Sequence, residues 1–108
     1  MARRVMITWR LNLAVPWPMD PKQSLEMDEK MWTMIDGLIK KGEIEEFAFF
    51  SDGYTGYAIG KTEVEDGFKN TSAFLPFVIC EVHDIVPYEK GKEITRAVLK
   101  ARIAAMKK

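Results

Sequence analysis

The chain is poor in the residues that most often carry recognisable chemistry. Its 108 residues include one cysteine, Cys80, and one histidine, His83. A single cysteine excludes an internal disulfide and any metal site built from several cysteines, and it favours a reducing cytoplasm. One histidine beside one carboxylate is too little to indicate a metal centre. We therefore expect neither a metal nor another cofactor.

Long apolar runs and nucleotide-binding motifs are also missing. No apolar run approaches the ~20 residues that span a bilayer. The basic start resembles a signal peptide only faintly, because Arg10 and Asn12 interrupt its apolar stretch. Neither a glycine-rich phosphate loop nor a Ser-His-Asp signature is present. These absences argue against a membrane-spanning, secreted or nucleotide-binding protein.

The net charge is zero, but the charges are unevenly distributed. Residues 1–10 carry three arginines and no acid, and residues 11–89 carry 6 basic and 15 acidic side chains, a net charge of −9. Residues 90–108 carry +6. The balanced total argues against a nucleic-acid partner or a membrane partner. The uneven distribution indicates that the basic tail lies against an acidic surface, within a subunit or across a dimer.

Hydrophobic periodicity predicts four strands and three helices in one domain, 1–108. Asp20 and Pro21 mark a helix start, Gly42 marks its stop, and Thr62 to Glu65 form a capping box. We expect strands at 5–13, 43–51, 54–61 and 77–86, and helices at 21–41, 62–75 and 92–107. We expect one face of the second strand to carry Phe47 and Phe49, its other face to carry Ile44, Ala48 and Phe50, and the second helix to bury Val64, Phe68, Thr71 and Leu75.

The element order is that of an α+β, ferredoxin-like βαββαβ fold (core 5–89) with an extra basic helix at 92–107. Right-handed crossovers give a four-stranded antiparallel sheet in the order 4-1-3-2, with helices on one face. The second and fourth strands are apolar on both faces, so the open face predicts a homodimer. The first helix has an apolar arc wider than one sheet requires, which indicates a further cover such as a ligand or a second subunit.

Short motifs resemble those of the dimeric α+β barrel superfamily. They are Met6-Ile7-Thr8-Trp9, Gly56-Tyr57-Ala58-Ile59, and Pro76-Phe77-Val78 leading to Glu81-Val82 and Val86-Pro87. The likeness covers residues 5–89 and is closest to a small uncharacterised family related to muconolactone-isomerase-like and antibiotic-biosynthesis-monooxygenase-like proteins. It implies a dimer of ferredoxin-like subunits. Enzymes of this superfamily use different residues for different reactions, so it implies no catalytic residue.

The first candidate site lies on the open face of the sheet. Arg10 on the first strand neighbours Glu81 and His83 on the fourth strand, which share a face because they are two residues apart. We expect Arg10 to pair with Glu81 and His83 to shuttle a proton. The alternative is an interface ion pair without chemistry.

The second candidate is a pocket between sheet and helices. Gly56, Ala58 and Gly60 on the third strand leave room for it, and Asp28 falls inside the apolar arc of the first helix. Asp28 is therefore a candidate acid or base; the alternative places it in water, with the methionines as core filler. The candidate ligand-binding residues are Trp9, Trp17, Met27, Met31, Trp32 and Tyr57.

We therefore expect a cytoplasmic homodimer that binds a small, mainly apolar molecule. The alternatives are a cofactor-free monooxygenase or isomerase in which Asp28 or His83 moves a proton, and a non-catalytic interaction module. An enclosed pocket of roughly 300 Å³ or more favours ligand binding. Cys80 should point into the core as an inert thiol. The basic helix has no aromatics among its charges, so we expect it to dock by its alanine face rather than on RNA or lipid.

Overall fold

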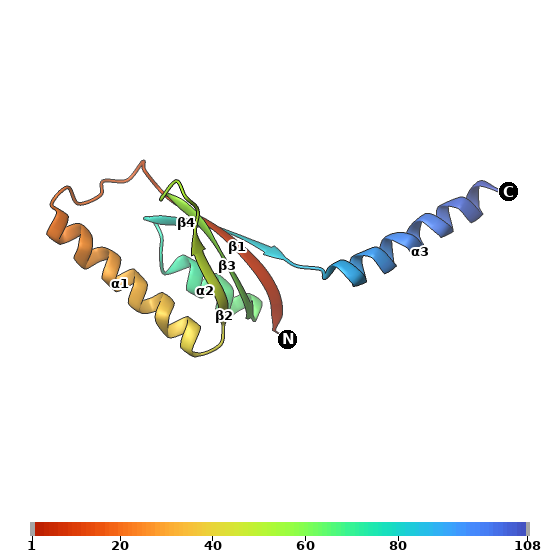
Figure 1. Ribbon diagram of the computed structural model, residues 1–108, viewed down its shortest axis with the longest axis horizontal. Coiled ribbons are helices and arrows are strands. Elements are labelled where there is room, and N and C mark those ends of the chain that lie inside the picture. Colours follow the sequence, from red (N-terminus) through yellow and green to blue (C-terminus); the bar gives the residue numbers. More distant parts are fainter. Residues whose placement is uncertain (1, 108) are drawn as a thin grey trace.

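The computed structural model describes residues 2–107 as seven elements in the order β-α-β-β-α-β-α (Figure 1). The strands are β1 (Arg3–Leu11), β2 (Ile44–Phe49), β3 (Thr55–Thr62) and β4 (Val78–Asp84). The helices are α1 (Pro21–Lys40), α2 (Val64–Ser72) and α3 (Tyr88–Met106). The predicted order is confirmed. The largest shift in a boundary is at α3, which begins at Tyr88 and includes Gly91, a residue expected to bound a turn.

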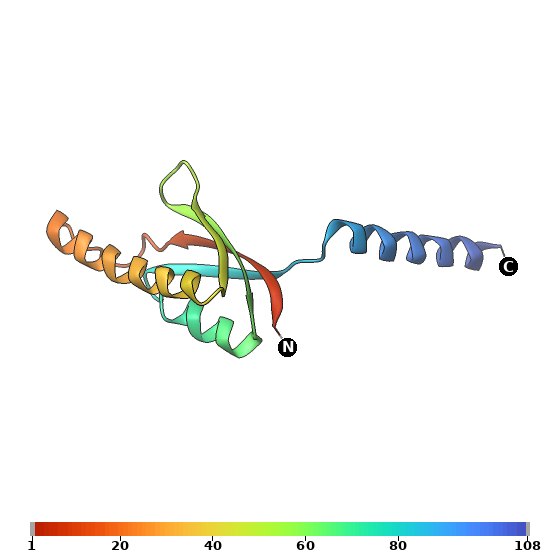
Figure 2. The ribbon, with the colours of Figure 1, turned by 60° about the horizontal axis from the view of Figure 1, so that its bottom comes forward.

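The four strands form one antiparallel sheet in the order β2-β3-β1-β4. This is the predicted order 4-1-3-2 counted from the other edge, so the ferredoxin-like fold class is confirmed. The central strand β1 pairs on both sides, and Trp9 lies opposite Gly56 of β3 and Cys80 of β4. Helices α1 and α2 lie on one side of the sheet and leave the other side open (Figures 1 and 2).

A bulge in β2 changes which side chains face the helices. The pairing of β2 with β3 shifts register between Ile44 and Glu46, so one additional residue is inserted. An additional residue moves a side chain to the opposite face. Ile44 consequently lies on the helix side together with Phe47. The prediction that placed Ile44 on the opposite face is wrong, because simple alternation does not anticipate a bulge.

The ends of the first helix follow the sequence signals, whereas the start of the second does not. The Asp20 carboxylate accepts a hydrogen bond from the Lys22 amide at 3.2 Å, and Gly42 adopts a left-handed φ of 79° after the last turn of α1. Both were predicted. At α2 the cap residue is Glu63, and the Thr62 hydroxyl donates to the Glu63 carbonyl at 3.0 Å. The predicted capping box at Thr62 is therefore wrong.

Helix α2 is rotated relative to the prediction. Gly67 is buried against Thr62, where an added Cβ would approach the Thr62 methyl group to 3.0 Å. The missing side chain lets this side of the helix approach the sheet. Val64 and Phe68 are consequently 59% and 74% exposed, and Leu75 is also exposed. Of the four residues predicted to be buried, Thr71 alone lines the interior.

The buried apolar residues lie on the helix-covered face of the sheet: Val5, Trp9, Ala58 and Val78. Helix α3 lies outside this core and extends away from it (Figures 1 and 2). The molecule consequently measures 70 × 29 × 24 Å, with a radius of gyration of 19.0 Å. A compact domain of this length has a radius of gyration of about 13 Å. The basic tail therefore does not lie against its own subunit, which was one of the two arrangements suggested by the charges.

Candidate functional site

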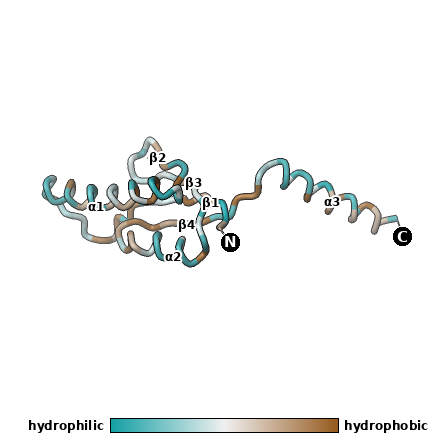
Figure 3. The backbone as a smooth tube through the Cα atoms, turned by 90° about the horizontal axis from the view of Figure 1, so that it is seen from below, coloured by the Kyte–Doolittle hydropathy of each residue, from teal (hydrophilic) through white to brown (hydrophobic). Residues whose placement is uncertain are grey.

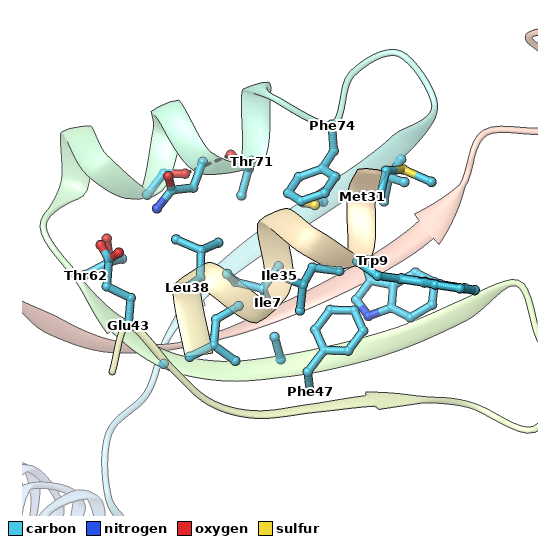
Figure 4. Close-up of a pocket in the computed structure, with 18 of the residues that line it drawn as sticks. Ile7, Trp9, Met31, Ile35, Leu38, Glu43, Phe47, Thr62, Thr71 and Phe74 are labelled. Atoms are coloured by element: carbon cyan, nitrogen blue, oxygen red, sulfur yellow. Dashed lines mark hydrogen bonds between the residues drawn. The ribbon is translucent and has the colours of Figure 1, made fainter. Parts of the chain in front are cut away.

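A cavity of about 190 Å³ lies between the helix-covered face of the sheet and the two helices (Figure 4). β1 contributes Ile7 and Trp9 to it, and β2 contributes Phe47. Helix α1 covers it with Met31, Ile35 and Leu38, and Phe74, which follows α2, closes another side. The sheet and both helices therefore leave an apolar space at the centre of the subunit.

The small residues of β3 make room for this cavity, as predicted. Ala58 and Gly60 line it directly. A Cβ added to Gly56 would clash with the Trp9 ring and with the Ala48 carbonyl. Gly56 is therefore needed for close approach, since the indole of Trp9 lies where a side chain of β3 would otherwise be.

Trp9 forms the centre of an aromatic cluster at the cavity wall. Its ring stacks on Phe47 with a centroid distance of 5.5 Å and an angle of 7°, and it meets Phe49 edge-on at 5.3 Å and 88°. The side chain is 7% exposed, and its buried indole Nε1–H has no hydrogen-bond partner within the described chain. A buried donor without an acceptor costs about 1–3 kcal/mol.

A few polar groups interrupt the apolar lining. The half-buried Asp28 of α1 lines the cavity, as the helical pattern predicted. Asn70 and Thr71 line it from α2, where the Thr71 hydroxyl donates to the Gly67 carbonyl at 3.0 Å. Apolar walls with a small number of polar groups are typical of small-molecule sites, in which the polar groups orient the ligand.

The structure brings together four of the seven residues predicted for this pocket, namely Trp9, Asp28, Met31 and Trp32. Trp17 lies elsewhere, because its indole donates to the Asn12 carbonyl at 2.8 Å and its ring packs edge-on against Phe77. Trp17 therefore holds the proline-rich loop between β1 and α1 in place. Met27 does not line the cavity either, and Tyr57 lies on the open face, where its ring contacts Phe50 at 5.8 Å.

The other predicted cluster lies on the open face, as expected, but without the expected pairing. Arg10 is opposite Ile79 on β4, and Glu81 and His83 are opposite Thr8 and Met6. All three members of the cluster are exposed, and His83 Nε2 lies 3.6 Å from Glu81 Oε2. Among the described residues Arg10 forms no ion pair with Glu81. Its register position is two residues away from Glu81, and within one subunit its side chain extends into solvent.

Sequence reasoning missed the contribution of α2 to the cavity. Asn70 and Phe74 line it, although the predicted inner stripe placed other residues there. The residue that marks the correct side is Gly67, where the missing side chain lets α2 approach Thr62 closely.

Cys80 lines the cavity on the covered face of β4, beside Trp9 of β1. Burial raises the pKa of its thiol above the ordinary value. A thiol with a raised pKa stays protonated near neutral pH and is a weak nucleophile. This supports the expectation of an inert core cysteine.

Comparison with protein-family models finds no match, and a search of curated proteins finds no relative that matches the chain. The structure shows the ferredoxin-like α+β fold that the resemblance implies, and the superfamily itself stays a prediction. Within residues 2–107, no group of three or more histidine, cysteine, aspartate or glutamate side chains is placed to hold a metal ion. No helix in the same range is long and apolar enough to cross a membrane.

Proposed function

We propose that this chain forms a homodimer that binds a small, mainly apolar molecule in the cavity between its sheet and helices α1 and α2. The observation that carries the proposal is the apolar cavity of about 190 Å³ between the sheet and the two helices. Protein interiors are close-packed, so an apolar space of this size favours a ligand. The lone Cys80 favours the cytoplasm as its location.

The volume restricts the class of ligand. The cavity of about 190 Å³ is smaller than the volume of about 300 Å³ expected of a ligand-binding pocket in this chain. Pockets for drug-sized ligands usually exceed about 300 Å³. An apolar cavity of roughly 150 Å³ admits benzene. We therefore propose a single-ring or short-chain molecule.

The homodimer is supported by surface area. The accessible surface of the chain is 8366 Å². A compact monomer of 12.4 kDa exposes about 6,100 Å². The chain therefore exposes about 2,200 Å² more than a compact monomer. This excess is similar to the area that one subunit buries in an obligate dimer. Half-buried apolar side chains on the open face, including Met6, Ile59 and Ile79, form one part of the surface available for this contact.

Calorimetric titration with phenol, with benzene as the comparison, tests ligand binding. We expect the wild type to bind both phenol and benzene, because each is a single ring that fits a mainly apolar cavity of about 190 Å³. Thr71→Leu adds apolar volume at the cavity wall and should abolish binding, whereas Thr33→Leu, at an exposed position on α1, should leave it unchanged. Failure of both probes to bind the wild type, or equal binding by Thr71→Leu, would contradict the proposal.

A second candidate function is a cofactor-free oxygenase or isomerase. It takes its support from Asp28, a carboxylate in the wall of a mainly apolar cavity. Such a carboxylate can remove a proton from a bound carbonyl compound. The wild type should then exchange the acidic protons of cyclohexenone in D₂O, as followed by NMR, and Asp28→Asn should bind cyclohexenone without exchange. Equal exchange by both proteins would exclude this role.

A further inference from the structure

Helix α3 has nothing covering it among the other described residues of its subunit. Every residue from 92 to 107 is exposed, including Ile94 at 53% and Val98 at 45% on one side and Ile103 at 55% on the side of Arg96. Figure 3 shows apolar and polar positions alternating along its length. Isolated helices of this length are marginal in water, and most helical stability comes from packing of apolar side chains. A helix of 19 residues that stands apart from its own subunit therefore indicates a docking partner.

One side of α3 has the spacing of a helix–helix seam. Small and β-branched apolar residues recur at alternating intervals of three and four, the pattern of a and d positions in a heptad. Glycine and alanine within such a seam let two helix axes approach closely. Arg102 flanks the seam, whereas Arg96 lies on the opposite side of the helix. The seam residues are Gly91, Ile94, Val98, Ala101 and Ala105.

A complementary stripe runs along α1 next to the side that faces the sheet, and its central residue, Trp32, also borders the cavity. Leu25, Trp32 and Ile39 recur at seven-residue intervals and are 52%, 42% and 45% exposed. Residues seven apart lie on the same side of a helix, so these three form a continuous apolar stripe. Glu29 and Asp36 lie beside it. This stripe accounts for the apolar arc of α1 that the sheet does not cover.

We propose that α3 of each chain docks along the Leu25–Trp32–Ile39 stripe of α1 in a second copy, so that two chains exchange their C-terminal helices. The inference rests on the proposed homodimer and specifies where α3 binds. Docking on α1 requires a second copy, because α1 and α3 of one chain lie at opposite ends of a 70 Å long molecule (Figure 1).

Charge favours α1 over a second α3 as the docking surface. Helix α3 carries five basic and two acidic side chains, so two α3 helices would repel each other. The −9 charge of residues 11–89 attracts the +6 of residues 90–108 instead. In this arrangement Arg102 lies near the acids Glu29 and Asp36 of the partner's helix. The contact then pairs the acidic residues of one chain with the basic helix of the other, and these opposite charges account for the balanced total.

Sedimentation equilibrium of full-length variants measures the contact. Val98→Asp places a charge in the seam and should raise the dimer dissociation constant by about tenfold or more, since each dimer contains the seam twice. Arg102→Glu beside the seam should raise it by about threefold or more, and Arg96→Glu, with the same charge change on the far side, should have a smaller effect. Circular dichroism controls for loss of helix.

A charge exchange identifies the docking surface. Asp36→Arg combined with Arg102→Glu restores opposite charges across the contact, so the double variant should dimerise more tightly than either single variant. Unchanged dimerisation of Val98→Asp would overturn the exchange, and so would equal effects of Arg102→Glu and Arg96→Glu. Absence of rescue would exclude the α1 stripe as the docking surface.

The outcomes separate this inference from the proposed function. A wild type that is monomeric at micromolar concentration would contradict both the proposed helix exchange and the proposed homodimer. Phenol binding tests the cavity independently of both. Val98→Asp that dimerises normally but no longer binds vesicles of phosphatidylserine would assign α3 to an anionic lipid surface and overturn the exchange.

Discussion

The two faces of the sheet differ in what covers them, although they are built from the same strands. On β1, Val5 and Trp9 face α1 and α2 and are almost fully buried, whereas Arg10, the next residue after Trp9, faces the open side and is exposed. The covered face forms a core around a cavity. The open face retains half-buried apolar residues such as Met6 and Ile59. The comparison teaches that the chain covers one face of its sheet with its own helices and leaves the other face uncovered.

The largest expected effect is at Trp9. Trp9→Ala removes the centre of the aromatic cluster and enlarges the cavity, and should lower the free energy of unfolding by about 3–5 kcal/mol. Arg10→Ala, one residue further on the open face, should change it by less than about 0.5 kcal/mol. Urea denaturation measures both. Equal losses of unfolding free energy in Trp9→Ala and Arg10→Ala would show that the two faces contribute equally to stability.

Gly56→Ala should have the next largest effect. The added Cβ would meet the Trp9 ring and the Ala48 carbonyl, so the strand or the ring must move, at a cost of about 1–3 kcal/mol. Lys61→Ala on the open side of β3 is the matched control and should be nearly neutral. A stable Gly56→Ala protein with unchanged tryptophan fluorescence would show that Trp9 is less tightly held than its contacts indicate.

Ile59→Asp tests the open face directly. Ile59 is half-buried on the open side of β3, opposite Met6. An aspartate there should weaken the proposed dimer by about tenfold or more while it leaves monomer stability almost unchanged, because solvent reaches this side of a single subunit. Sedimentation gives the dissociation constant. A dimer of wild-type strength would show that the subunits associate through another surface.

The smallest expected effect compares two neighbouring thiols. Burial raises the pKa of Cys80 on the covered face, so labelling by a thiol reagent should be slow at pH 7 and accelerate only above the ordinary range for thiols. Ile79→Cys in a Cys80→Ala background places the thiol on the open face, where labelling should be faster and should follow the ordinary pKa. Equal rates would indicate that the cavity opens readily to solvent.

Much of the fold could be predicted because its signals are local. Asp20 and Gly42 end α1 through their own backbone and side-chain chemistry, and the strand order follows from chain connectivity. The bulge that moves Ile44 to the covered face could not be predicted, since it depends on how β2 pairs with β3. The rotation of α2 followed from the close approach at Gly67, which a count of apolar residues does not weigh.

The candidate site was predicted correctly where its signals are local and wrongly where they are not. Helical spacing was enough to place Asp28, Met31 and Trp32 together on the inner side of α1. Trp17 was assigned to the cavity because it is aromatic and near in sequence, but its hydrogen bond to Asn12 holds it beside Phe77. A loop residue has no periodicity, so its position depends on contacts that form only in the folded chain.

The sequence by itself determined the elements, their order, the sheet and the separation of an acidic body from a basic helix, because periodicity, capping and charge are properties of short segments. The tertiary structure alone decided which apolar faces meet within the chain. It buried Trp9 beneath the helices, left a cavity beside it, and directed α3 away from the body. Packing is a relation between distant segments, so no local pattern could decide which apolar faces this chain covers and which it leaves exposed.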